Sequence, residues 1–358
     1  MGDLQKIVTL NDPQISPDGK EVALIVSTPD WKTDKPRVEI DLVDAADGQR
    51  RTLVSNRESL SSPRWSPSGA QLAFLAKDPE TREVQIFVMP MSGGDAVRVT
   101  DNKQGVDDYS WSPDGKSIAF IAQDPPLNAG AMKAHNKVFR VTDGHFLLTK
   151  DVAPWHLWVI PAAGGEARRL TEGKFSLGTH PGGAATPVWS HDARRIAFTK
   201  FPNAYWAQSF RSVIAEVDVA SGEMRTLVPE QGSEDFKFAP AGGDYAFARA
   251  RTGDRNNGNA IYVHADGRTY DATAALARHF SNYVWMPDGR TLITAGGLGA
   301  RTVLWKQPLS GKAGLLDLGN VEANDGLGIT TSDNTTRISV SRTGVVAFIG
   351  TTATHPCE

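Results

Sequence analysis

The chain has 358 residues, of which 40% are hydrophobic, so a globular chain with a sizeable core is expected and a disordered one is not. Its 38 basic and 41 acidic residues give a net charge of −3, which excludes a strong electrostatic attraction to nucleic acid or to an anionic membrane; a peptide or protein partner fits better. Cys357 is the single cysteine and no run of about 20 apolar residues occurs, which excludes an internal disulfide, a thiolate metal cluster and a membrane-spanning helix.

The first residues predict a short helix. Asp3 is a suitable N-cap for a helix over residues 3–9, the only helix that the sequence predicts. The opening Met1–Lys6 lacks both the basic and the apolar segment of a secretory signal. The chain as written is therefore expected in the cytoplasm, or in the periplasm if a signal has been removed.

A repeated turn sequence follows. Its clearest copy is Trp111-Ser112-Pro113-Asp114-Gly115, and an apolar run from Ile118 to Ala122 comes directly after it. Other copies start at Ile15, Trp65, Trp189, Phe238, Trp285 and Val340. Five of the six intervals are about 46 to 55 residues, and the sixth is 78 (189 − 111). A period of this length is typical of propeller blades.

Each copy predicts two strands joined by a tight turn. Proline presets φ early in the turn, glycine accepts the left-handed conformation later, and the aspartate between them can bond the turn backbone. Outer hairpins follow, as in Ile86–Pro90 with Val97–Thr100 and Leu157–Pro161 with Arg168–Thr171. The prediction is an all-β fold, a seven-bladed β-propeller with four-stranded antiparallel blades, in one domain over residues 1–358. The tryptophans that open four of the copies are expected to pack between blades.

The long interval marks an insertion at residues 124–155, in the third repeat. A surface loop or an excursion hairpin with solvated charges is the simpler interpretation. The alternative is a segment that lines or gates the propeller axis, in which Arg140 or His145 contacts a substrate carboxylate or carbonyl. His135, His145 and His156 lie in this region, but their spacing fits no standard metal site, so solvated or structural histidines are expected.

The last repeat is short. It supplies an inner pair of strands at Arg337–Ser341 and Val345–Gly350, and the chain then stops at Glu358 before any outer hairpin. The seventh blade is therefore predicted to be incomplete, with an exposed backbone edge.

Recognisable catalytic sequences are absent. The chain contains no Gly-x-Ser-x-Gly nucleophile elbow, no His-Glu-x-x-His zinc site, no phosphate-binding loop and no dinucleotide fingerprint. Ser112-Pro113-Asp114-Gly115 looks like the sialidase box, but its glycine comes one residue too early. No catalytic residue, bound metal or cofactor is expected in this chain.

The copies Ile15–Lys20 and Trp111–Lys116 resemble the propeller repeats of TolB-type proteins and of the prolyl oligopeptidase family. Leu10–Gly19 and His156–Thr171 look most like bacterial acylaminoacyl peptidases and dipeptidyl aminopeptidases. The resemblance implies a propeller that covers a C-terminal α/β-hydrolase domain, admits short peptides and excludes folded proteins. That domain is missing here, so no catalytic residue can be carried over, and endo- or exopeptidase specificity stays open.

Three functions are consistent with the sequence. The first is the non-catalytic propeller portion of a serine peptidase, with a short peptide substrate and its own C-terminal hydrolase domain as partners in the full-length parent, and with homo-oligomerisation left open. The second is a stand-alone TolB-like propeller that binds a protein. The third is a propeller glycosidase or lactonase, which would need a bound metal or activity on sugars or lactones.

Overall fold

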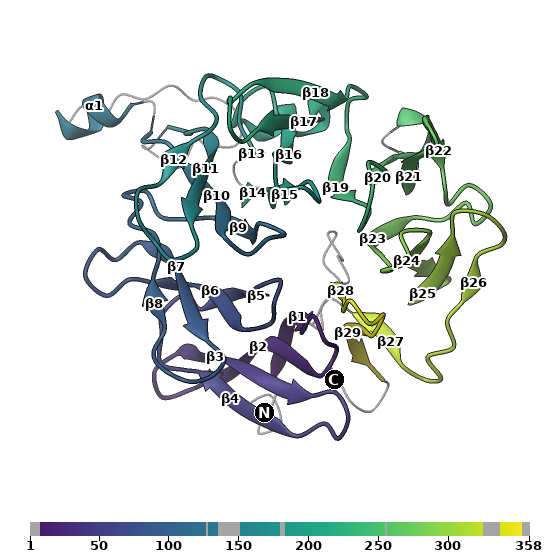
Figure 1. The fold of residues 1–358 in the computed structure, drawn as a ribbon, viewed down its shortest axis with the longest axis horizontal. Helices are drawn as coiled ribbons and strands as arrows, with labels where there is room; N and C mark the ends of the chain where they lie inside the picture. Colours follow the sequence, from purple (N-terminus) through teal and green to yellow (C-terminus); the bar gives the residue numbers. More distant parts are fainter. Residues whose placement is uncertain are drawn as a thin grey trace. The chain divides into compact units, whose positions relative to one another are not determined.

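The computed structural model describes residues 8–126, 128–134, 151–179, 183–254, 256–324 and 337–352. These residues form antiparallel sheets whose strands follow one another along the chain, and the fold is a seven-bladed β-propeller (Figure 1). The chain divides into two compact units. The first unit comprises Met1–Lys77, Ile86–Val97 and Ala239–Glu358, and the second comprises Asp78–Gln85 and Arg98–Phe238. The predicted fold class is confirmed.

Six blades have four strands each among the residues that the structure describes. Blade 1 comprises β1 (Thr9–Ile15), β2 (Glu21–Asp30), β3 (Lys35–Asp44) and β4 (Arg50–Val54). Blade 2 comprises β5 (Ser61–Trp65), β6 (Gln71–Lys77), β7 (Val84–Pro90) and β8 (Val97–Arg98). Blade 3 comprises β9 (Asp108–Trp111), β10 (Ser117–Gln123), β11 (Trp155–Pro161) and β12 (Arg168–Arg169).

The next three blades repeat the same order. Blade 4 comprises β15 (Val188–Trp189), β16 (Arg195–Lys200), β17 (Val213–Asp218) and β18 (Met224–Val228). Blade 5 comprises β19 (Glu234–Phe238), β20 (Tyr245–Ala250), β21 (Asn259–Ala265) and β22 (Arg268–Asp271). Blade 6 comprises β23 (Phe280–Trp285), β24 (Thr291–Leu298), β25 (Arg301–Pro308) and β26 (Gly314–Leu315).

The seventh sheet has three strands in the described part of the chain: β27 (Glu322–Asn324), β28 (Ile338–Val340) and β29 (Val346–Thr351). β28 and β29 match the predicted inner pair. β29 also pairs with β27, which precedes both strands and was not predicted. Three residues carry too little alternation of polar and apolar side chains to be recognised as a strand.

Blades 1 and 7 contact each other directly within the first unit. The Ile15 amide donates to Ser339 Oγ at 3.0 Å, and the Arg342 amide donates to the Pro17 carbonyl at 3.0 Å. The buried Asp12 carboxylate binds Arg64 Nη1 of blade 2 at 2.7 Å and Arg337 Nη1 at 3.5 Å. This one carboxylate therefore links the first blade to blades 2 and 7.

The repeated turn is stabilised by its serine. Ser112 Oγ donates to Asp114 Oδ1 at 2.6 Å and accepts the amide of Ser117 at 2.9 Å, and Asp114 Oδ1 accepts the Lys116 amide at 3.0 Å. The copies at Ser16 and Ser190 have the same bonds. The serine hydroxyl lowers the pKa of Asp114, as it does in the other two copies. The turn predicted from proline, aspartate and glycine is confirmed, and the serine connects it to the following strand.

One copy has alanine at the glycine position. Ala193 has φ of 58°, whereas Gly115 in the equivalent place has φ of 70°. A methyl group is strained in this conformation and glycine is not. We expect Ala193→Gly to raise the free energy of unfolding by about 0.5–1 kcal/mol, because the Ala193 methyl is only partly buried and little packing is lost.

Urea denaturation followed by circular dichroism measures this change. Ala220→Gly is the matched control, because Ala220 lies in an exposed turn and is not among the residues with positive φ. It is expected to lower stability slightly, through the greater freedom of the unfolded chain. A loss of stability in Ala193→Gly equal to that in the control would contradict the assigned strain.

Tryptophans of the repeat connect neighbouring blades. Trp65 Nε1 donates to the Gln14 carbonyl of β1 at 2.8 Å. Trp189 Nε1 donates to the Ser110 carbonyl of β9 at 3.3 Å. In both cases the indole reaches the inner strand of the preceding blade, so the predicted packing between blades is confirmed for these copies. The core lies between blades as well: one cluster in the second unit joins Ile121 and Leu157 of blade 3 to Phe198 of blade 4.

The helix predicted over residues 3–9 lies mostly outside the described residues, because residues 3–7 are not described, so over these residues it stays a prediction. It does not reach its predicted end, because Thr9 already belongs to β1. Helical segments occur elsewhere, as α1 (Ala129–Lys133) and the 3-10 helices η2 (Trp206–Arg211) and η3 (Arg251–Gly253). They bury no side chain and have no side-chain cap, so the sequence carries no amphipathic or capping pattern that would reveal them. Among the helices that the structure describes, none is long and apolar enough to cross a bilayer.

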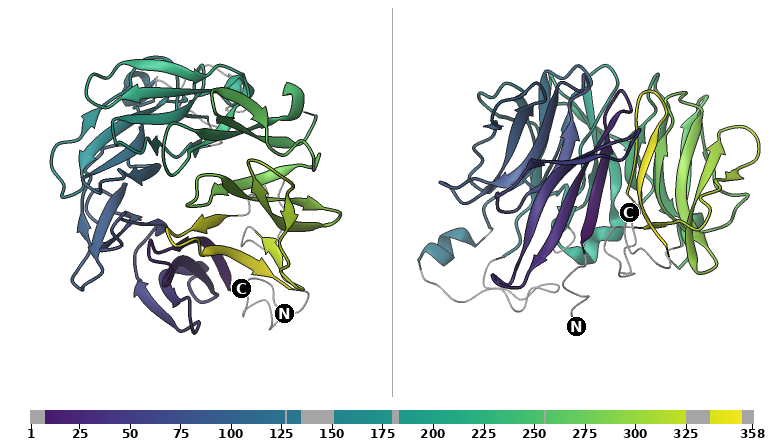
Figure 2. Two further views of the ribbon diagram at one scale, coloured as in Figure 1. Left: turned by 45° about the vertical axis from the view of Figure 1, so that its right-hand side comes forward. Right: turned by 90° about the horizontal axis from the view of Figure 1, so that it is seen from below.

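The insertion leaves blade 3 between two paired strands. β10 and β11 are antiparallel neighbours, with Gln123 opposite Trp155, so residues 124–154 connect adjacent strand ends. α1 belongs to this connection and lies away from the strands of blade 3 (Figures 1 and 2). A further hairpin, β13 (Gly178–Thr179) with β14 (Gly183–Ala184), lies between blades 3 and 4 in sequence and was also not predicted.

Candidate functional site

A cavity of about 480 Å³ lies on blade 3, at the base of the insertion. Three parts of the blade form it: the connection from β8 to β9, the end of β10 with the start of the insertion, and β11 with the hairpin to β12. The lining residues are Asp101, Asn102, Lys103, Gln104, Phe120, Gln123, Asp124, Pro125, Trp158, Ile160, Gly165, Ala167 and Arg169. We call this the blade-3 pocket.

An aromatic and cationic row crosses the pocket. Phe120, Trp158 and Arg169 lie opposite one another in register on β10, β11 and β12. The Phe120 and Trp158 rings stack with centroids 6.2 Å apart, and the Arg169 guanidinium lies 5.6 Å from the centre of the indole. Since Phe120 is buried and Trp158 only half-buried, the indole offers the exposed apolar surface.

A carboxylate orients this arginine. Arg169 Nη2 donates to Asp124 Oδ2 at 3.0 Å, and Arg169 Nε donates to the Thr171 carbonyl at 2.7 Å. The guanidinium is therefore fixed across the indole and keeps other donors for a ligand.

A buried histidine lies behind Asp124. His156 Nε2 is 3.6 Å from Asp124 Oδ2, and His156 Nδ1 is 3.1 Å from Thr171 Oγ1. Thr171 Oγ1 already accepts the Leu157 amide at 2.9 Å, so its own hydrogen is free for Nδ1. Donation from Thr171 Oγ1 to Nδ1 leaves the hydrogen of the neutral imidazole on Nε2, the nitrogen nearer to Asp124.

Burial lowers the pKa of His156 below its ordinary value of 6.5, and the charge of Asp124 opposes this effect only in part. Between the folded pKa and 6.5 the unfolded chain binds a proton that the folded chain does not, so stability is expected to fall as the pH drops through this interval. His156→Gln lacks the titrating imidazole, so this dependence of stability on pH is absent in the variant. Unfolding free energies measured from pH 8 to pH 5 should therefore fall more in the wild type than in His156→Gln, and parallel curves would contradict the assignment.

The pocket is suited to binding, and nothing in it forms a metal site. A half-buried indole, a guanidinium and a carboxylate can hold a group with apolar and polar parts, such as a peptide side chain. Among the residues that the structure describes, no group of three or more His, Cys, Asp or Glu side chains could hold a metal ion.

The residues singled out from the sequence have different outcomes. Arg140 and His145 lie outside the described residues, so their role stays a prediction. His156 is fully buried and structural, as expected. Ser112 and Asp114, which looked like part of a sialidase box, bond to each other within a turn. Phe120, Trp158 and Arg169 were not predicted as a site, although their strands were predicted, Phe120 in the apolar run after the repeated turn and the other two in the outer hairpin.

Comparison with known proteins agrees with the repeats. Residues 5–126 match the family model for the TolB beta propeller domain. Over these residues the chain is similar to TolB-type β-propellers. The uncharacterized peptidase YuxL of Bacillus subtilis (strain 168) is 32% identical to this propeller over 94 residues, which are 26% of this chain and 14% of that relative.

Solved structures share the fold of this chain over almost its whole length. Acylaminoacyl peptidase from Pyrococcus horikoshii has a TM-score of 0.71 at 15% identity, over 99% of this chain and 51% of that one. The β-propeller domain of the trilobed protease from Pyrococcus furiosus, described as having an open velcro topology, has a TM-score of 0.67 at 14% identity, over 99% of this chain and 92% of that one. The chain thus spans about half the length of the acylaminoacyl peptidase.

Proposed function

We propose that the chain is the non-catalytic propeller portion of a serine peptidase and controls the access of peptides to a C-terminal α/β-hydrolase domain. The observation that carries the proposal is the match of 99% of this chain to 51% of an acylaminoacyl peptidase. The local likeness to a second peptidase at 32% identity supports it. No Gly-x-Ser-x-Gly sequence occurs in the chain, so under this proposal the hydrolase domain supplies the nucleophile.

The blade-3 pocket would contribute by holding a substrate side chain. Because the strands of a blade are antiparallel, the connection from its second to its third strand leaves from the end at which its first strand starts. The insertion therefore extends from the end of blade 3 where β9 begins, next to the pocket. We propose that Arg140 and His145 of this insertion contact the carboxylate or carbonyl of a peptide, while Trp158 packs against its side chain.

The nucleotide sequence after codon 358 tests the proposal. We expect the reading frame to continue into further strands and then into a Gly-x-Ser-x-Gly segment followed by an aspartate and a histidine in that order. A stop codon directly after Glu358 would contradict it.

The match to the TolB beta propeller domain favours a second candidate, a stand-alone propeller that binds a protein. Affinity purification of the chain from its own host distinguishes the two. Recovery of one stoichiometric partner, together with a stop codon after Glu358, is the outcome that this alternative predicts.

A further inference from the structure

Blade 5 differs from its neighbours in its outer turn. In five blades the residue after the third strand donates its amide to a carbonyl of the first turn, as Leu309 does to Arg290 at 2.8 Å. The other four pairs are Ala45 with Lys20, Met91 with Ala70, Ala162 with Lys116, and Val219 with Arg194. In blade 5 the strands β21 and β22 are joined by Asp266 and Gly267 alone, with φ of 51° and 76°. The residue after the third strand of blade 5 is therefore Asp266 of this two-residue turn, where blade 6 has Leu309.

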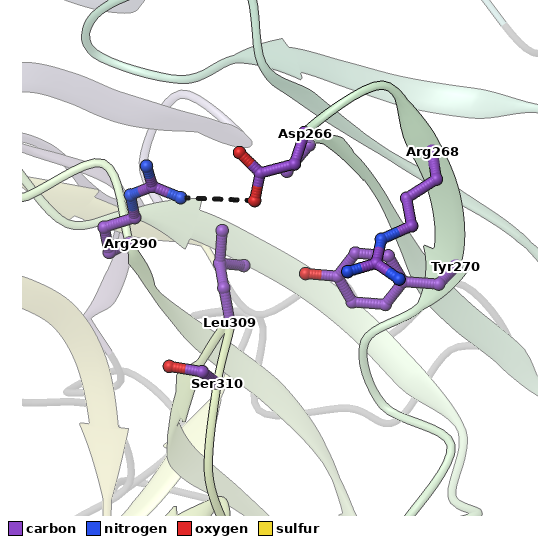
Figure 3. Close-up of a pocket in the computed structure, with 7 residues that line it drawn as sticks. Asp266, Arg268, Tyr270, Arg290, Leu309 and Ser310 are labelled. Carbon is purple, nitrogen blue, oxygen red and sulfur yellow. Dashed lines mark ion pairs between the residues drawn. The ribbon is translucent and has the colours of Figure 1, made fainter.

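A cavity of about 580 Å³ lies beside this short turn, between blades 5 and 6 of the first unit. Its lining residues are Ala265, Asp266, Arg268, Tyr270, Arg290, Leu309 and Ser310. Figure 3 shows Arg268 beside the Tyr270 ring, Asp266 directed toward Arg290, and Leu309 between the two groups. We call this the blade-5/6 pocket.

The charge of this pocket is positive. It contains two guanidinium groups and one carboxylate. Arg290 Nη1 and Asp266 Oδ2 are 3.9 Å apart, and the two side chains are 64% and 71% exposed, so this pair is loose. Arg268 forms no ion pair with any residue that the structure describes. The pocket therefore keeps guanidinium donors for an anion.

The hydroxyl and apolar groups of the pocket indicate which class of anion fits it. Burial raises the pKa of Tyr270, so its hydroxyl stays protonated at neutral pH and can donate, as can that of Ser310. Leu309, Ala265 and the Tyr270 ring present apolar surface in the same cavity. A bare inorganic anion would leave this surface and most of the volume unused, whereas an organic carboxylate with an apolar group would use both.

The blade-5/6 pocket shares no lining residue with the blade-3 pocket. It is formed by the turns that follow β21, β23 and β25, the first and third of which close outer hairpins. Within each antiparallel blade these turns lie at the end opposite to the start of its first strand. A ligand here therefore contacts other side chains than a peptide held by the blade-3 pocket.

We propose that the blade-5/6 pocket binds a small organic carboxylate with an apolar side group, such as the C-terminal residue of a short peptide, through the guanidinium groups of Arg268 and Arg290. The apolar group packs against Leu309 and the ring of Tyr270. Arginine suits this role because its planar donors match the two oxygens of a carboxylate.

Titration calorimetry with N-acetyl-leucine, N-acetyl-leucinamide and inorganic phosphate tests this proposal on the full chain. We expect N-acetyl-leucine to bind with a Kd of about 1 mM, as suits a ligand of few atoms, and the uncharged amide and phosphate to bind at least about tenfold more weakly. Equal binding of the acid and the amide would overturn the proposal. Tighter binding of phosphate would overturn the assignment to a carboxylate.

Substitutions test whether the two arginines bind the ligand. Arg268→Gln and Arg290→Gln are each expected to weaken the binding of N-acetyl-leucine at least about tenfold. Both positions are exposed, so neither substitution is expected to disturb folding. Arg194→Gln is the matched control, because Arg194 occupies in blade 4 the turn position of Arg290 and its carbonyl likewise accepts an outer-turn amide. It should leave the affinity unchanged. An equal loss in the control, or no loss in either pocket variant, would contradict the site.

Discussion

Replacing Trp189 by alanine is expected to lower the free energy of unfolding by about 3–5 kcal/mol. The side chain is 8% exposed and packs in the cluster that joins blades 3 and 4, next to residues such as Leu177 and Phe198. Truncation removes a large ring from this interface and leaves the Ser110 carbonyl without its indole donor. Urea denaturation followed by far-ultraviolet circular dichroism measures the change.

Two controls separate packing from the loss of a hydrogen bond. Trp189→Phe keeps an aromatic ring and loses the indole N–H, so a smaller cost of about 1–2 kcal/mol is expected. Trp206→Ala removes a tryptophan that is 53% exposed on η2, and its cost should stay within about 0.5 kcal/mol. If Trp189 served a ligand and not the interface between blades, Trp189→Ala would be as stable as Trp206→Ala.

The second large effect is expected at a glycine of blade 6. Gly296→Ala should lower the free energy of unfolding by about 1–3 kcal/mol. A Cβ at this position would lie 2.5 Å from the His279 carbonyl oxygen and 3.3 Å from the Trp305 ring. The first atom belongs to the backbone directly before β23, so the clash can be relieved only by moving β23 and β24 apart.

The next residue is a matched control. Gly297 lies on the same strand, and a Cβ there would meet nothing within 4 Å. Gly297→Ala is therefore expected to change stability by no more than about 0.5 kcal/mol, or to raise it slightly through the reduced freedom of the unfolded chain. Equal losses in the two variants would show that a lower preference of alanine for this strand, and not the close approach at Gly296, determines the loss of unfolding free energy.

The sequence predicts most of the fold because the information lies in short segments. The proline, aspartate and glycine of the repeat determine a turn within five residues, and the apolar run after each turn determines a buried strand. The serine bonds of Ser112 and its equivalents need no distant residue either. Elements without such local chemistry were missed, including the three residues of β27 and the five of α1.

The pockets depend on residues that are distant in the chain. Phe120, Trp158 and Arg169 meet only because three strands pair in one register, and the sequence does not specify this register. In blade 5 the Asp266-Gly267 pair predicts a tight turn, but not the open space that this turn leaves beside Arg290 of the next blade. Strand positions were therefore accessible from sequence, and the binding surfaces were not.

Hydrolysis of peptides of graded length tests the central claim most directly. The 358-residue chain is compared with the longer gene product that the proposal expects, on aminoacyl and peptidyl p-nitroanilides and on a folded protein. We expect no turnover by the chain alone, and turnover by the longer product that is abolished by a fluorophosphonate and is far faster on short peptides than on the folded protein. Fluorophosphonate-sensitive turnover by the 358-residue chain itself, or equal rates on short peptides and the folded protein, would contradict the account.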